Sequence, residues 1–95
     1  MQLLGKQKTN TFKAKHTNAR SNIESWEAEV ERACWENPHQ MKERYPTADP
    51  IGNLNTIFNI NGNKYRIWAQ INYEHQIALI KEVGTHEEYL KWKIK

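Results

Sequence analysis

The chain has 95 residues, 38% of them hydrophobic, and its four Trp and four Tyr allow one modest core but no second domain. We therefore predict a single domain over residues 1–95. No apolar run approaches the roughly 20 residues that a membrane span needs, and the first residues, MQLLGKQK, lack the apolar region of a signal peptide. These features predict a cytoplasmic protein with no membrane partner.

Cysteine and histidine usage gives no sign of a metal site. Cys34 is the only cysteine, so the chain offers neither an intrachain disulfide nor a thiolate cage. The four histidines show no ligand spacing: His16, His39, His75 and His86. We expect no metal and no other cofactor.

The charge is mildly basic and unevenly distributed. A formal charge of +3 and a pI near 9.1 suit a polyanionic partner without requiring one. Residues 1–20 hold five cations and no acid, whereas residues 24–36 hold five glutamates against Arg32 alone. We therefore expect basic and acidic surfaces that are separated along the chain.

The first half of the chain predicts a short strand followed by helices. Residues 1–4 fit a strand, and residues 8–17 (KTNTFKAKHT) fit a weak helix anchored by Phe12. A clearer helix is predicted over residues 21–37, because Ser21 and Glu24 form a capping-box pattern. Its apolar residues recur at helical spacing: Ile23, Trp26, Val30, Ala33 and Cys34. Its outward glutamates are expected to form a solvated face.

The middle of the chain is punctuated by turn-forming residues. Asn37-Pro38 ends the helical pattern, and one helical turn is predicted around residues 41–45. An irregular stretch should follow, since it contains Pro46, Pro50 and Gly52.

Three strands are predicted next, as an antiparallel meander over residues 56–60, 64–73 and 76–83. A two-residue Asn61-Gly62 turn would pair Ile60 with Asn63 and Phe58 with Tyr65, which keeps the apolar side chains on one face. A Glu74-His75 loop would pair Tyr73 with Gln76 and Trp68 with Lys81.

The opposite face of this sheet carries a polar patch that spans the three strands: Asn59, Lys64, Arg66, Trp68, Gln70 and Lys81. Cations with an interleaved aromatic fit phosphates and stacked bases, although an ordinary solvated sheet face has a similar pattern. Ile57, Leu79 and Val83 fall on the same face, which predicts a concave or partly covered surface.

The chain ends with a second capping-box pattern. Thr85 and Glu88 place His86 at the first position of a terminal helix, with Tyr89 one turn later on the same side. An imidazole there can serve as acid or base near neutral pH. The alternative is a surface histidine beside Tyr89 and Trp92 as core anchors.

Three motifs together resemble the HigB family of type II toxin–antitoxin toxins, within the wider RelE-like group. They are Tyr45-Pro46 followed by Ala48-Asp49, then FNINGNKYRI, then VGTHEEY, in that order and at the family's spacing. Residues 24–38 (ESWEAEVERACWENP) fit the family's long helix, so the resemblance covers roughly residues 18–92. It implies an α+β fold: a small, twisted, mostly antiparallel sheet with two N-terminal helices on one face and a short C-terminal helix.

The resemblance also implies an activity. Members of this kind are mRNA endoribonucleases, or mRNA interferases, that cleave translated mRNA on the ribosome without a metal. A HigA-type antitoxin with a helix-turn-helix domain inhibits them, and DNA is contacted only through that antitoxin.

Matching the motifs makes Arg66 and His86 the leading catalytic candidates, with Tyr89 and Lys64 second. Metal-free cleavage needs a base for the ribose 2′-OH, an acid for the departing 5′-oxygen and cations for the phosphorane. His86 fits the first two roles, and the planar fork of Arg66 fits the third. We predict further RNA contacts at Lys81, Trp68, Asn63 and Gln70, of which Trp68 rests on the strand pattern alone.

Two other functions use the same sheet face. A catalytically silent RNA-binding module would use Arg66 and Lys81 to position RNA, while His86 merely caps the helix. A protein-interaction domain would use the mixed polar and apolar face to receive a partner segment.

Overall fold

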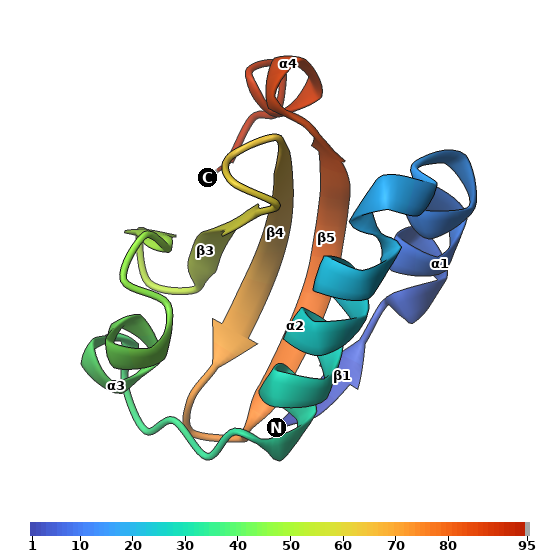
Figure 1. Cartoon of the computed structure of the whole chain (residues 1–95). Helices are drawn as coiled ribbons and strands as arrows, with labels where there is room; N and C mark the ends of the chain where they lie inside the picture. The colour runs from blue at the N-terminus through green and yellow to red at the C-terminus, as the bar shows by residue number, and fades with distance from the viewer. Residues whose placement is uncertain (95) are drawn as a thin grey trace.

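The computed structural model describes residues 1–94 and has an α+β fold, in which helices pack on a five-stranded sheet (Figure 1). The elements are β1 (Gln2–Leu4), α1 (Lys6–Lys15), the 3₁₀ turn η1 (Thr17–Ala19), α2 (Arg20–Arg32), α3 (Pro38–Arg44), β2 (Asp49–Ile51), β3 (Asn55–Ile60), β4 (Tyr65–Asn72), β5 (Ile77–Thr85) and α4 (His86–Tyr89). Within residues 1–94 no helix has the length and apolar character to cross a membrane.

The sheet has the strand order β1-β5-β4-β3-β2. Strand β1 pairs with β5 in parallel, and the other neighbours are antiparallel. The predicted mostly antiparallel sheet, the two N-terminal helices and the short C-terminal helix are therefore confirmed.

The core lies between the sheet and α2. Ile23, Trp26 and Val30 of α2 are buried, and the Trp26 ring meets Phe58 of β3 edge-on at 5.2 Å between centroids. On β4, every second residue from Tyr65 to Ile71 is buried against this cluster. The opposite face of β4 is thus turned away from α2.

Both ends of α2 differ from the prediction. The prediction of a Ser21–Glu24 capping box is wrong. The turn η1 leads directly into α2, which begins at Arg20, and the N-cap of α2 is Ala19, which makes no side-chain hydrogen bond to the helix. Ser21 therefore lies inside the helix. The helix ends at Arg32, since Ala33 is extended, and Cys34 is exposed beyond it.

The segment between α2 and β3 is more ordered than predicted. Helix α3 has seven residues rather than one turn, and β2 pairs with β3 where an irregular stretch was expected. The Tyr45 hydroxyl donates to the Glu29 carboxylate at 3.0 Å, which ties the end of α3 to α2. Burial and this carboxylate both raise the pKa of Tyr45.

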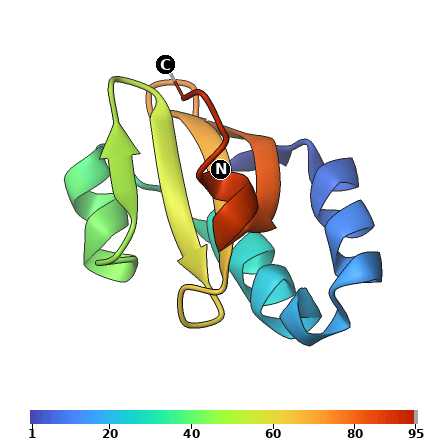
Figure 2. The same cartoon turned by 90° about the horizontal axis from the view of Figure 1, so that it is seen from above.

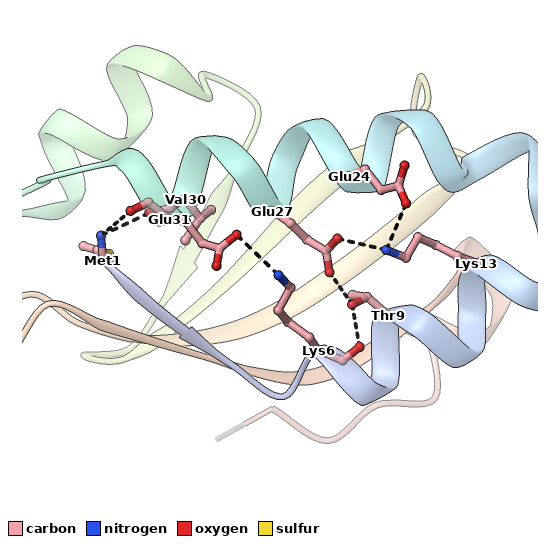
Figure 3. A network of polar contacts seen from close by, with 8 residues as sticks. All are labelled: Met1, Lys6, Thr9, Lys13, Glu24, Glu27, Val30 and Glu31. Atoms are coloured by element: carbon pink, nitrogen blue, oxygen red, sulfur yellow. Dashed lines mark hydrogen bonds and ion pairs between the residues drawn. The ribbon is translucent and has the colours of Figure 1, made fainter.

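Charged side chains join α1 to α2, and one glutamate of α2 faces inward while Glu24 and Glu31 are exposed. Glu27 is buried, and Lys13 Nζ lies 3.0 Å from its Oε1 while the Thr9 hydroxyl donates to its Oε2 (Figure 3). Lys13 also reaches the exposed Glu24 at 3.5 Å, and Lys6 pairs with Glu31 at 3.4 Å. Two cations of the basic segment therefore pair with three glutamates of the acidic segment across the helix pair.

We expect Lys13→Met to reduce the free energy of unfolding by about 3–5 kcal/mol, because it leaves a buried carboxylate without its cation. The double variant Lys13→Met/Glu27→Met should recover much of that loss. Urea denaturation measures both, and Lys8→Met, at an exposed position of the same helix, is the control, expected within about 0.5 kcal/mol of the parent. A loss below about 1 kcal/mol for Lys13→Met would show that the pair does not hold the helices together.

The β3–β4 hairpin keeps the predicted faces but not the predicted loop. Ile60 pairs with Tyr65 and Phe58 with Ile67, so residues 61–64 form a four-residue loop rather than a two-residue turn. Three consecutive loop residues have positive φ, at 57°, 62° and 73° for Asn61, Gly62 and Asn63. The register shift of two residues preserves the side-chain alternation.

The β4–β5 pairing follows the predicted register only in its first half. Asn72 pairs with Ile77 and Ala69 with Ile80, as expected for a loop centred on Glu74-His75. The register then shifts between Trp68 and Ala69, so Trp68 lies opposite Glu82 and not Lys81. Lys81 is the extra residue of a β-bulge in β5. Because of this bulge, the Val83 side chain packs against the core and not on the polar face.

Candidate active site

The polar face of β4 carries Arg66, Trp68 and Gln70, all half-buried and turned away from α2. In Figure 2 the C-terminal segment after β5 lies across one side of the sheet, while α2 lies on the other. Arg66 stands between Asn59 of β3 and Gly84 of β5 in the sheet register. The predicted polar face is therefore partly covered by the end of the chain.

Helix α4 places His86 at the end of this face. The predicted capping box is confirmed: the Thr85 hydroxyl accepts from the Glu88 amide at 3.2 Å, and the Glu88 carboxylate accepts from the Thr85 amide at 2.9 Å. The His86 amide donates to the Lys64 carbonyl at 3.2 Å, which ties the helix start to the β3–β4 loop.

Arg66 and His86 are in direct contact. Nη2 of Arg66 lies 3.1 Å from Nδ1 of His86, and Nη1 donates to the Asn63 carbonyl at 2.6 Å and to the Tyr65 carbonyl at 3.4 Å. Because a guanidinium has only donors, Nδ1 must accept, and the proton of the neutral imidazole then lies on Nε2. These contacts use at most three of the five guanidinium N–H groups, which leaves the rest for an anion.

An aromatic row borders this pair. The Tyr89 ring lies 5.4 Å from Arg66 Cζ, within the range of a cation–π contact. The Tyr89 ring also lies 6.1 Å from His86 and 5.7 Å from Trp92, and Trp92 lies 6.2 Å from Trp68. The row therefore joins the predicted stacking residue to the predicted acid or base.

The four predicted catalytic side chains belong to one end of the sheet, and His86 and Lys64 are exposed there. Of the predicted RNA contacts, only Asn63 adjoins Arg66 directly. Trp68 and Gln70 both donate to the Asn55 side chain, at 2.8 and 3.2 Å.

The remaining predicted contact, Lys81, lies at the bulge in β5 and, together with Trp68, lines a cavity that Arg66 and His86 do not line. The assignment of all these residues to RNA binding or catalysis stays a prediction.

Gly84 is a structural part of the site that the sequence did not indicate as such, and Trp92, named above as a possible core anchor, packs against it. A Cβ at position 84 would lie 3.0 Å from Trp92 Cζ2 and 3.1 Å from Glu88 Cβ. Glycine thus allows α4 and Trp92 to pack directly on the strand opposite Arg66. The signal in the sequence is only the glycine within VGTHEEY.

Residues 1–94 bring together no group of three or more His, Cys, Asp or Glu side chains suited to holding a metal ion. Cys34 instead lines a cavity of about 650 Å³ with Glu36, Tyr73, Glu74 and Gln76, beside the β4–β5 turn. That cavity contains none of the predicted site residues.

Comparison with known proteins identifies the family. A sequence model of the HigB toxin family, the RelE-like toxic component of a toxin–antitoxin system, matches residues 19–92. The chain belongs to the HigB toxin family. It is 32% identical over 62 residues to proteins named mRNA interferase toxin HigB in Escherichia coli K12 and mRNA interferase HigB in Shigella flexneri. The match covers 63% of this chain, which spans 60% of the length of each of these relatives.

The cap that orients His86 in this HigB-family chain should depend on pH. The hydrogen bond from the Thr85 amide holds the Glu88 pKa below its ordinary value of 4.5, and the charges of Lys15, at the end of α1, and of His16, directly after it, add to the effect. Because the Glu88 pKa is lower in the folded state, the cap makes its full contribution to the free energy of unfolding above about pH 4.5. This contribution is lost as the pH falls through the pKa of Glu88 in the folded protein.

The chemical shift of the Thr85 amide should therefore show an acidic transition below pH 4.5. Glu88→Gln retains an acceptor for this amide but has no titrating carboxyl, so its transition should vanish. An unchanged transition in Glu88→Gln would assign it to another group.

Proposed function

We propose that this chain is the toxin of a type II toxin–antitoxin system and acts as an mRNA endoribonuclease that inhibits translation. The observation that carries the proposal is the 3.1 Å contact between Arg66 and His86 on an open surface. The contact supports the proposal because a guanidinium can bind phosphate and an imidazole beside it can transfer a proton, on a surface that a polymer can reach. Membership of the HigB toxin family and the relatives named mRNA interferase support the same function.

The proposed reaction is metal-independent transfer within the RNA. The ribose 2′-oxygen attacks the adjacent phosphorus, the bond from phosphorus to the 5′-oxygen breaks, and the products are a 2′,3′-cyclic phosphate and a 5′-hydroxyl. The base takes the proton of the 2′-OH, and the acid gives a proton to the departing 5′-oxygen. No cofactor enters the reaction.

His86 and Arg66 divide this work according to their contacts. Arg66 contacts Nδ1 of His86, so Nε2 carries the proton of the neutral ring. When the guanidinium turns to the phosphate it releases Nδ1, which takes the proton of the 2′-OH, and Nε2 then gives its proton to the departing 5′-oxygen. The free N–H groups of Arg66 bind the phosphoryl oxygens and stabilise the charge of the phosphorane. Tyr89 holds the guanidinium and either orients the phosphate or stacks on a base, and Lys64 adds positive charge.

The proposed partners follow from the same function. The substrate is translated mRNA, cleaved on the ribosome in the cytoplasm. A HigA-type helix-turn-helix antitoxin neutralises the toxin, and the toxin reaches DNA only through it. A silent RNA-binding or protein-interaction module would have the same sheet face, but it would not need an imidazole held against a guanidinium.

We expect Arg66→Ala and His86→Gln to relieve the growth arrest caused by the parent. Loss of the cation should slow mRNA cleavage roughly 10²- to 10³-fold, and loss of the acid or base roughly 10²- to 10⁴-fold. Cleavage is measured under single-turnover conditions with ribosomes present, together with RNA affinity and circular dichroism. RNA binding should persist in His86→Gln.

Two matched controls use the same substitutions elsewhere. Arg32→Ala at the end of α2 and His39→Gln in α3 change exposed side chains and should leave cleavage within a few-fold of the parent. If folded Arg66→Ala and His86→Gln proteins cleaved as fast as these controls, Arg66 and His86 would not be the catalytic residues. If the purified parent bound RNA but did not cleave it with ribosomes present, the chain would be a binding module. If the parent bound RNA no better than it bound a neutral polymer, the protein-interaction alternative would be favoured.

A further inference from the structure

A cavity lies beside Trp68, on the face of β4 that also carries Arg66. It has a volume of about 390 Å³ and is lined by residues that include Gln7, Lys8, Trp68, Leu79, Lys81 and Glu82. Trp68 follows Arg66 by two residues on the same face of β4, a separation of about 7 Å along a strand. This cavity is therefore a direct continuation of the proposed active-site surface.

Two backbone features build the cavity. The bulge in β5 places Glu82 directly opposite Trp68 and leaves Lys81 as the extra residue beside it. Gly5 has a φ of 88°, and a Cβ there would lie 2.7 Å from the Ile80 carbonyl, so glycine lets the start of α1 press against β5. That approach brings Lys8 to the rim of the same cavity.

The charged side chains that line this cavity do not take part in the polar contacts that hold the described fold together. Within residues 1–94, the side chains of Lys8, Lys81 and Glu82 make no hydrogen bond or ion pair, although they line one cavity. The indole N–H of Trp68, in contrast, is held by Asn55 at 2.8 Å, which fixes the ring in place. The cavity thus presents a fixed aromatic side chain, two cations and one carboxylate to a ligand.

We propose that this cavity is a base-selective subsite that binds a guanine flanking the cleaved bond, an inference that rests on the proposed ribonuclease function. The aromatic side chain of Trp68 stacks on the base, and Lys8 and Lys81 bind its phosphates. The Glu82 carboxylate repels phosphate, so it faces the base edge and accepts hydrogen bonds there.

The choice of guanine follows from the chemistry of an ionised carboxylate, which only accepts hydrogen bonds. On its pairing edge guanine presents two adjacent donors, N1–H and the 2-amino group, and these match two carboxylate oxygens. Adenine and cytosine each place an acceptor next to their single amino group. Uracil flanks its one N–H with two carbonyl oxygens, which the carboxylate repels.

The test uses uncleavable 2′-O-methyl tetranucleotides, namely a uridine tetramer and four versions with guanine at one position. One of the four should bind the purified parent about tenfold more tightly than the uridine tetramer, as expected for a bidentate contact to a base edge. Glu82→Gln should reduce this ratio to below about twofold. Glu43→Gln, at an exposed position of α3, should keep it.

Cut sites mapped across a transcript in the presence of ribosomes give the second readout. The parent should show guanine at one fixed offset from the cut, and Glu82→Gln should lose that enrichment while it continues to cleave. A parent without guanine preference, or a Glu82→Gln protein that retains the preference, would overturn the subsite. A parent that prefers guanine in binding but never cleaves mRNA would contradict the ribonuclease proposal and leave the subsite standing.

Discussion

The bulge at Lys81 is the constraint on which the site depends. Up to Ile80 the pairing of β5 with β4 is regular, and one extra residue then moves every later residue of β5 by one position. As a result Val83 packs into the core, and Gly84 rather than a larger side chain lies opposite Arg66. The cap at Thr85 follows at once, so His86 begins its helix beside the guanidinium.

The two faces of the sheet have different roles because of how charge is distributed around them. On the helical face, the buried Lys13–Glu27 pair joins α1 to α2 and removes both charges from the surface. On the other face, Arg66, Lys64 and Lys81 form no ion pair with any of residues 1–94, so their charge remains available to a polyanion. These three cations can therefore contribute to the attraction of the proposed substrate to this face.

Local patterns predicted the elements that depend on neighbours in the sequence. Alternation in β4 gave its two faces, and the Thr85–Glu88 spacing gave the start of α4. Contacts between distant segments were not predictable in this way. The burial of Glu27 depends on a lysine in another helix, and the bulge depends on packing that the run of residues in β5 does not reveal. The family motifs, and not periodicity, paired Arg66 with His86.

The proposed function requires Arg66 and His86 to support attack by the 2′-oxygen without a metal ion. Analysis of the RNA ends produced by the purified protein on ribosome-bound mRNA tests it most directly, with a divalent-metal chelator added under conditions that keep the ribosomes intact. We predict that cleavage continues and that the new ends are 2′,3′-cyclic or 3′-phosphates with 5′-hydroxyls. Loss of cleavage on chelation with intact ribosomes, or products with 3′-hydroxyl ends, would contradict the account.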